Sequence, residues 1–140
     1  MSTQDPTQFD KLPLKSKKFL AYLIADIGWK IVAINVSDIA AMGRLPDWAT
    51  LSISLPEDTD QEWVVAFAKG MRKALKKWQI SLLGGDTTRS KKGIFVSMAM
   101  GSRAGRQITW RSGAKAGDDV WVTGQLGNAA FGFYNPDSSV

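Results

Sequence analysis

The sequence predicts an α+β fold. Two long segments, at about residues 16–43 and 59–78, carry the three- and four-residue apolar spacing of amphipathic helices. Short apolar runs that are typical of strands lie at 48–55, 80–83 and 94–100. Because these helices and strands do not alternate strictly, a regular parallel α/β fold is not expected. The 140 residues, 44% of them hydrophobic, suit one domain or part of a larger one.

The first helix should begin near Ser16 and end near Gly43, because glycine commonly follows the last helical turn and Pro46 lies just beyond. Residues 1–15 before it look like a loose leader. The helix includes an apolar patch, residues 19–24, that is too short to span a membrane. Steps of three, four and seven predict the side that faces the core, which carries Ile27, Ile31, Ile34 and Ala41.

Residues 48–55 alternate between apolar and polar, which predicts a half-buried strand with one apolar side: Ala49, Leu51, Ile53 and Leu55. The spacing of Thr59 and Glu62 is that of a capping box and predicts the start of a second helix. One face of that helix should lie in the core and carries Trp63, Phe67, Ala74 and Trp78. A glycine inside it, Gly70, indicates close packing or a nearby ligand.

The second half of the chain reads as strands and turns. A strand at 80–83 should run into a glycine loop at 84–88, followed by a basic turn at 89–93 and a strand at 94–100. A further strand could start at 107–110, another is expected at 119–123, and a short helix at about 126–133.

The composition limits the chemistry. The chain has no cysteine and no histidine, so thiolate sites, histidine-bound zinc and imidazole bases are excluded. Aspartate, glutamate and hydroxyl groups favour a hard cation such as Mg²⁺. The net charge of +5 could indicate nucleic-acid binding, but the densest basic run, residues 72–77, is more simply explained as a solvated helix face. A phosphate-rich small substrate would also suit a basic surface.

The segment Gly84-Gly85-Asp86-Thr87-Thr88 is the strongest candidate site. Glycines allow close approach of a ligand, a carboxylate can bind a metal, and hydroxyls can bind phosphate oxygens. These residue types in this order indicate a nucleotide-phosphate site. The alternative for such a short motif is an ordinary turn.

Two other groups of polar residues are weaker candidates. Asn35 and Asp38 are three residues apart and share one side of the first helix, beside small residues that permit packing around an acid. The alternative is a solvated helix face. Arg111 precedes a small, flexible stretch, from which a guanidinium group can reach over a phosphate. Its alternative is a basic surface turn.

Four motifs in this order resemble the thiamine-monophosphate kinase family. They lie at residues 35–43 (Asn-Val-Ser-Asp-Ile-Ala-Ala-Met-Gly), 84–88, 111–118 and 122–127, with a matching lead-in at 26–30. Sister families that share the fold are the aminoimidazole-ribonucleotide synthetases, the selenophosphate synthetases and the hydrogenase-maturation proteins. The resemblance implies a mixed sheet packed against helices, an incomplete version of the N-terminal domain of the aminoimidazole-ribonucleotide-synthetase-like fold.

The resemblance also implies roles for single residues. Asp38 and Asp86 would ligate Mg²⁺, Gly85 would lie against ATP, and Arg111 would contact the ATP phosphates. The two aspartates should then converge on one magnesium–triphosphate. The reaction would move the γ-phosphoryl group of ATP onto thiamine monophosphate, a nucleophile that is already anionic and needs no general base.

The departures from the family set the expected domain organisation. Residues 16–134 would form a partial domain for ATP and Mg²⁺, and 135–140 would be the truncated start of a missing C-terminal domain. The family's Gly-Asp-Asp strand has no counterpart in residues 1–25.

The expected partners are thiamine monophosphate, ATP and a second copy of the chain in a homodimer, with neither nucleic acid nor a membrane. The expected location is the cytoplasm. The alternative is an inactive fragment that retains dimerisation or weak nucleotide binding.

Overall fold

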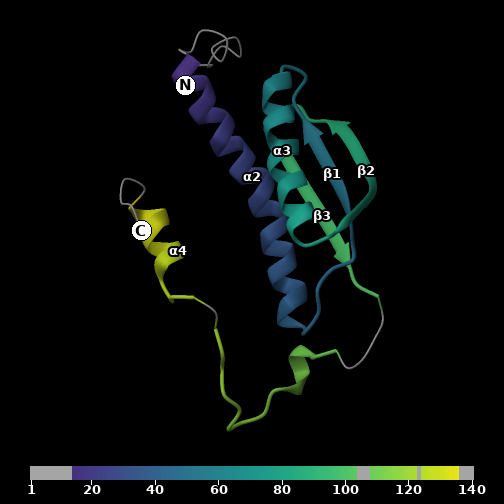
Figure 1. Ribbon diagram of the computed structural model, residues 1–140, viewed down its shortest axis with the longest axis vertical. Coiled ribbons are helices and arrows are strands. Elements are labelled where there is room, and N and C mark those ends of the chain that lie inside the picture. The colour runs from purple at the N-terminus through teal and green to yellow at the C-terminus, as the bar shows by residue number, and fades with distance from the viewer. Residues whose placement is uncertain (1–13, 104–107, 123, 136–140) are drawn as a thin grey trace. The chain divides into compact units, whose positions relative to one another are not determined.

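The computed structural model describes residues 14–103, 108–122 and 124–135. The chain divides into two units, Met1–Trp110 and Arg111–Val140, each described by itself below. In the first unit, helices α2 (Leu14–Ala41) and α3 (Gln61–Lys77) pack on a sheet. The strands of that sheet are β1 (Trp48–Leu55), β2 (Ser81–Arg89) and β3 (Phe95–Gly101) (Figure 1). The α+β fold is confirmed.

The sheet is mixed and has the order β2-β1-β3. The central strand β1 is parallel to β2 and antiparallel to β3. Its apolar side is the predicted one, because Ala49 and Ile53 are buried under the helices, with Leu51 and Leu55 packed against the same core. Since paired residues point to the same face, Ser52 faces away from the helices together with its two partners, Asp86 and Ser97.

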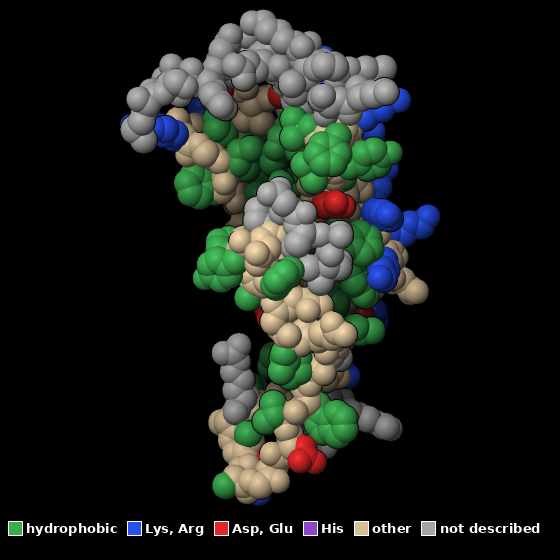
Figure 2. Space-filling view, turned by 90° about the vertical axis from the view of Figure 1, so that its left-hand side faces the viewer, with side chains coloured by type: hydrophobic (Ala, Val, Ile, Leu, Met, Phe, Trp, Pro, Cys, Tyr) green, Lys and Arg blue, Asp and Glu red, His purple; other side chains and the backbone are tan. Residues whose placement is uncertain are grey.

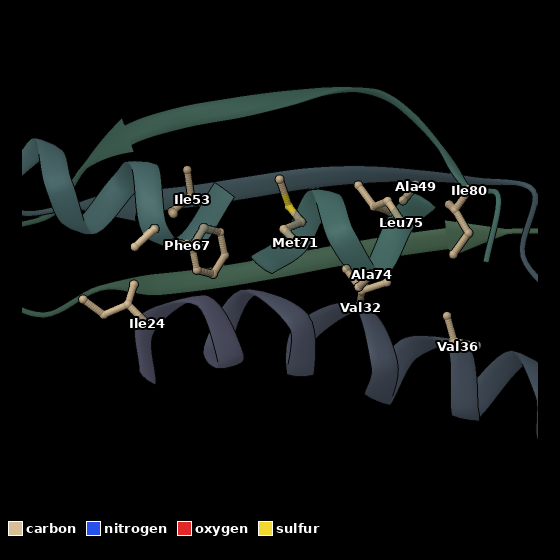
Figure 3. Close-up of a cluster of buried hydrophobic side chains, with 11 residues drawn as sticks. Ile24, Val32, Val36, Ala49, Ile53, Phe67, Met71, Ala74, Leu75 and Ile80 are labelled. Carbon is tan, nitrogen blue, oxygen red and sulfur yellow. The ribbon is translucent and has the colours of Figure 1, made fainter. Parts of the chain in front are cut away.

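The side of α2 that faces the core differs from the predicted one. Ile24, Val32 and Val36 are buried against α3 and β1 (Figure 3). By contrast, 47% of Ile27 and 52% of Ile34 are exposed to solvent. The helix carries apolar residues on two sides, so the spacing of large side chains alone does not identify the buried one. The small residues identify it, because they let α3 approach.

The two helices touch backbone to backbone through glycines. A Cβ atom on Gly70 would lie 1.7 Å from the carbonyl oxygen of Ala25, and one on Gly28 would lie 2.1 Å from that of Phe67. Both distances are far below van der Waals contact, so neither position has room for a side chain. The prediction that Gly70 marks close packing is confirmed.

The start of α3 is capped one residue later than expected. Asp60 is the N-cap, and its Oδ1 accepts a hydrogen bond of 2.8 Å from the backbone N–H of Glu62. The hydroxyl of Thr59 instead donates to the carbonyl oxygen of Pro56 at 2.7 Å and closes the preceding turn. The predicted helix is confirmed, with aspartate rather than threonine as its cap.

The outer face of α3 is basic and partly organised by tryptophans. The rings of Trp29 and Trp78 lie 5.3 Å apart. The Nζ atom of Lys77 lies 5.3 Å from the centre of the Trp29 ring and 5.1 Å from that of Trp78, and the Nζ of Lys73 lies 5.6 Å from Trp29. These lysines therefore stabilise the helix pair by cation–π contacts as well as facing solvent.

The second unit contains a short 3-10 helix, Arg111–Gly113, and helix α4 (Asn128–Tyr134). The predicted short helix is thus confirmed, two residues late at its start. The prediction of a strand at 119–123 is wrong for residues 119–122, which form no strand. Val120 and Val122 are exposed. Residues 108–110 form no strand either. Residues 107, 123 and 136–140 lie outside the described ranges.

The first helix begins at Leu14, inside the predicted leader, and residues 1–13 are not described. The apolar segment of this helix is longer than the predicted patch: Lys17–Ala41 is long and apolar enough to cross a membrane by length and composition. This is weak evidence for a membrane span, because the core helix of a soluble protein passes the same test.

Asp47 joins the start of β1 to the end of β3. Its Oδ2 accepts from the backbone N–H of Arg103 at 2.8 Å and from the hydroxyl of Ser102 at 3.4 Å, and its Oδ1 lies 3.5 Å from Nη2 of Arg103. The hydrogen bond from the Arg103 backbone, helped by the guanidinium charge and outweighing partial burial, holds the pKa of this carboxyl below its usual value.

We predict that Gly70→Ala lowers the free energy of unfolding by about 1–3 kcal/mol, because the new methyl group meets the backbone at Ala25. Denaturant unfolding measures the change. Gly132→Ala is the matched control, since Gly132 is also helical but has open space around its Cβ position. Equal stability of the Gly70 variant and the parent would contradict the close contact.

We predict that Asp47→Asn reduces the acid sensitivity of the fold. Because the pKa of Asp47 is lowered in the folded state, its stabilising effect is present above its unfolded pKa of 3.8. It is lost as the pH falls through the lower folded value. The melting temperature of the parent should therefore drop more steeply than that of the variant between pH 5 and pH 3. Parallel curves would rule out this linkage.

Candidate functional site

The predicted glycine loop is part of a strand. β2 continues through Gly84, Gly85 and Asp86 to Arg89, and all of its residues are exposed at the edge of the sheet. A register shift opposite Ala49/Thr50 absorbs one extra residue, which is how the two glycines fit without forming a turn. The loop interpretation was wrong because glycine is typical both of turns and of bulges in strands.

Gly85 lies against the central strand. A Cβ atom at this position would lie 1.8 Å from the carbonyl oxygen of Leu51, its partner on β1. The absence of a side chain therefore lets β2 come close to β1. It leaves this stretch of backbone without the cover that a side chain would give.

Asp86 and Thr88 point to the face of the sheet that the helices leave uncovered. Their register partners on β1 are Ser52 and Ser54, whose side chains share that face. The hydroxyls of Ser54 and Thr88 are 2.5 Å apart and hydrogen bonded. The surface thus combines one carboxylate with several hydroxyls, a set of oxygen ligands and donors that suits a hydrated cation or a phosphate.

Asp38 lies elsewhere. It is exposed near the end of α2, a helix that packs with α3 on the opposite face of the sheet from Asp86. Its neighbour Asn35 donates from Nδ2 to the carbonyl oxygen of Ile31 at 2.8 Å. The structure therefore does not bring Asp38 and Asp86 together, contrary to the expectation that they converge.

Arg111 opens the 3-10 helix of the second unit. Its side chain lies outside what the structure describes, and the two units are not placed relative to one another. The described residues contain no group of three or more acidic side chains that could hold a metal ion. Two separated carboxylates do not fit a shared Mg²⁺ ion within the described part of the chain.

A cleft of about 720 Å³ was not predicted from the sequence. It is lined by Pro56, Glu57, Asp58, Arg89, Ser90 and Lys91 at the carboxyl ends of the parallel strands β1 and β2. Such an edge is a common ligand position in parallel sheets. The Arg89 guanidinium pairs with Glu57 at 3.3 Å, so both charges are partly engaged. The cleft could not be predicted because the sequence does not show that β1 and β2 are parallel neighbours whose carboxyl ends meet.

A cleft of about 980 Å³ lies between α2 and α3, and most of its lining surface is apolar. No predicted site residue lines it. Its size alone does not make it the reactive site, because its two lining carboxylates, Asp26 and Glu62, belong to no group of three or more acidic side chains that could hold a metal ion within the described residues.

Residues 13–104 match the family described as AIR synthase related protein, N-terminal domain. The chain belongs to this family. It is 43% identical to a thiamine-monophosphate kinase of Escherichia coli (strain K12) over 112 residues, covering 77% of this chain and 33% of that protein. A thiamine-monophosphate kinase of Buchnera aphidicola subsp. Schizaphis graminum is 40% identical over 120 residues, covering 85% and 36%.

Solved structures agree. The thiamine-monophosphate kinase of Stenotrophomonas maltophilia K279a matches with a TM-score of 0.69 and 45% identity, over 80% of this chain and 35% of that one. A structure described as AaThiL complexed with AMPPCP and TMP matches with a TM-score of 0.52 and 35% identity, over 55% and 25%. The chain thus spans about a third of the length of the curated relatives it matches. The resemblance to thiamine-monophosphate kinases and the N-terminal-domain fold are confirmed.

We predict that Gly85→Ala destabilises the pairing of β1 with β2, at a cost of about 1–3 kcal/mol, because its Cβ would overlap the carbonyl of Leu51. Hydrogen exchange should show faster exchange of the β2 amides. Gly113→Ala serves as the control, since nothing lies within 4 Å of its Cβ position. Unchanged protection of β2 in the Gly85 variant would contradict the close approach.

Proposed function

We propose that the chain contributes the nucleotide-binding part of a thiamine-monophosphate kinase, which transfers the γ-phosphoryl group of ATP to thiamine monophosphate. The similarity to thiamine-monophosphate kinases over about four fifths of the chain carries this proposal. A relative bound to AMPPCP and TMP supports the choice of ATP and thiamine monophosphate as substrates. The absence of histidine and cysteine is compatible with the reaction, because an anionic phosphate needs positioning and charge neutralisation rather than a base.

The uncovered face of β2 is the proposed contact surface for the nucleotide. Asp86 would be the metal ligand on this face. Its neighbour Gly85, whose register partner is Leu51 on the helix-covered side, remains a proposed contact for ATP through its backbone. Asp38 and Arg111 remain proposed ligands of metal and phosphate. Because Asp38 lies on α2, which packs on the face of the sheet opposite to Asp86, each aspartate would need further oxygen ligands from outside its own surroundings to hold Mg²⁺.

A homodimer in the cytoplasm is also proposed. Among the described residues the sheet has three strands, and the face opposite the helices carries the exposed Trp48 and Phe95 rings. An open sheet face with two unpaired edges is a surface that a second copy could cover. The basic surface is assigned to anionic small molecules, with no nucleic-acid or membrane partner.

The second candidate function is a non-catalytic domain that folds and pairs with a copy of itself. The observation that favours it is the separation of the two aspartates, together with the lack of an acidic cluster in the described residues. A radiolabelled-ATP transfer assay combined with sedimentation distinguishes the two candidates. Dimerisation without transfer to thiamine monophosphate supports the non-catalytic domain.

We predict that the full chain binds AMPPCP only in the presence of Mg²⁺ and that Asp86→Asn weakens this binding at least tenfold, about 1.4 kcal/mol. The reason is the loss of a charged metal ligand. Isothermal titration calorimetry measures the affinity, with EDTA as the metal-free reference.

Asp119→Asn is the matched control, because Asp119 is also exposed but lies in the second unit and lines neither β2 nor the cleft at the ends of β1 and β2. If Asp86→Asn and Asp119→Asn leave the affinity equal, Asp86 is not a metal ligand. If no variant or parent binds the nucleotide, the nucleotide-binding proposal fails for this chain.

A further inference from the structure

The cleft of about 980 Å³ between α2 and α3, called the α2–α3 cleft below, plays no part in the proposed function. The two helices run in the same direction, cross at Gly28 and Gly70, and diverge toward their N-terminal ends (Figure 1). Among the described residues, the cleft is lined by positions within 18–29 of α2 and 61–73 of α3. Its volume is that of a small-molecule binding site.

The surface of the α2–α3 cleft is mostly apolar because short side chains leave the space between the helices unfilled. Residues that are buried or half-buried form its floor: Ala21, Ala25, Ala66 and Gly70. Larger groups lie at its rim, where 44% of Val65 and 72% of Tyr22 are exposed. A ligand with an apolar part would remove this hydrocarbon surface from water.

Lysines outnumber carboxylates around the α2–α3 cleft. Its lining includes Lys18, Lys69 and Lys73 but only two carboxylates, Asp26 and Glu62. Within the described residues, none of these five groups belongs to an ion pair. Figure 2 shows hydrophobic side chains bordered on one side by Lys and Arg side chains. An apolar surface next to excess positive charge is complementary to a molecule that is apolar at one end and anionic at the other.

The positive charge is concentrated at one end of the cleft, beside Trp29. Lys69, Lys73 and Lys77 follow one another at four-residue intervals and therefore share one side of α3. The Nζ atoms of Lys73 and Lys77 lie 5.6 Å and 5.3 Å from the centre of the Trp29 ring, which itself lines the cleft. These contacts hold two ammonium groups next to the apolar surface.

We propose that the α2–α3 cleft binds a small amphipathic anion, with its alkyl chain on the apolar floor and its carboxylate beside Lys69 and Lys73. A bare phosphate would leave the apolar surface exposed to water, and a cationic amphiphile would be repelled by the lysines. The helices lie on the opposite face of the sheet from Asp86, so this site is separate from the proposed nucleotide surface and does not depend on it.

Isothermal titration calorimetry of the full chain with decanoate tests the proposal. Decyltrimethylammonium is the charge-reversed probe with a similar alkyl chain, and inorganic phosphate is the anion without an apolar part. Decanoate should bind with one molecule per chain, and neither of the other two probes should bind. No binding of decanoate, or equal affinity for decanoate and decyltrimethylammonium, overturns the proposal.

Charge reversal tests the position of the carboxylate. Lys69→Glu combined with Lys73→Glu should weaken decanoate binding about tenfold or more, because attraction becomes repulsion. The same variant should gain affinity for decyltrimethylammonium. Arg72→Glu combined with Lys76→Glu is the matched control, since both residues are exposed on α3 without lining the cleft. Equal decanoate affinity of the two double variants overturns the assignment of Lys69 and Lys73.

Val65→Trp tests the position of the alkyl chain, because the larger ring would fill the cleft from its exposed rim. It should abolish decanoate binding, whereas Ala68→Trp, at an exposed position of α3 outside the lining, should not. Circular dichroism checks that each variant folds. A folded Val65→Trp variant with unchanged decanoate affinity overturns the proposal.

Sedimentation with phosphatidylglycerol vesicles tests a membrane surface as the competing ligand. Binding of the parent chain to such vesicles without binding of free decanoate assigns the cleft to lipid and overturns the proposal. Titration with AMPPCP and Mg²⁺ is a separate measurement on the other face of the sheet, so the kinase proposal and this one fail separately.

Discussion

The crossing of α2 and α3 at Gly28 and Gly70 is the contact on which the rest of the first unit depends. Each glycine lies against a backbone carbonyl of the other helix, so the axes come closer than any side chain would permit. That approach lets Ile24, Val32 and Val36 reach the same core as Phe67 and the strand residues Ala49 and Ile53 (Figure 3). Side chains of only moderate size can then fill the space between two helices and a sheet.

This packing also decides which surfaces remain free. Both helices use one face of the sheet, so the opposite face of β1 and β2 is left with Ser52, Ser54, Asp86 and Thr88. On the side of α2 away from α3, Phe19, Ile27 and Ile34 are exposed. The two surfaces differ in chemistry, because one is rich in oxygen atoms and the other is apolar.

The sequence was sufficient for the elements with a single strong periodicity. The strand at 48–55 and the helix from 61 to 77 were predicted because apolar and polar residues occupy separate sides. The sequence did not identify the buried side of α2, because its two apolar sides differ chiefly in the glycine at residue 28. It also did not identify the full length of β2, because the two glycines of this strand are typical of a turn. The relation between Asp38 and Asp86 depends on which face each element presents, which spacing along the chain does not encode.

The order of the strands leaves β3 at an edge of the sheet, and the composition of β3 makes this edge prone to aggregation. Phe-Val-Ser-Met-Ala-Met-Gly, residues 95–101, contains neither charge nor proline, whereas the other edge strand carries Asp86 and Arg89. Uncharged edges of high β-propensity are where misassembled intermolecular ladders begin. In concentrated solution, the first step toward fibrillar aggregation of this molecule should therefore involve β3.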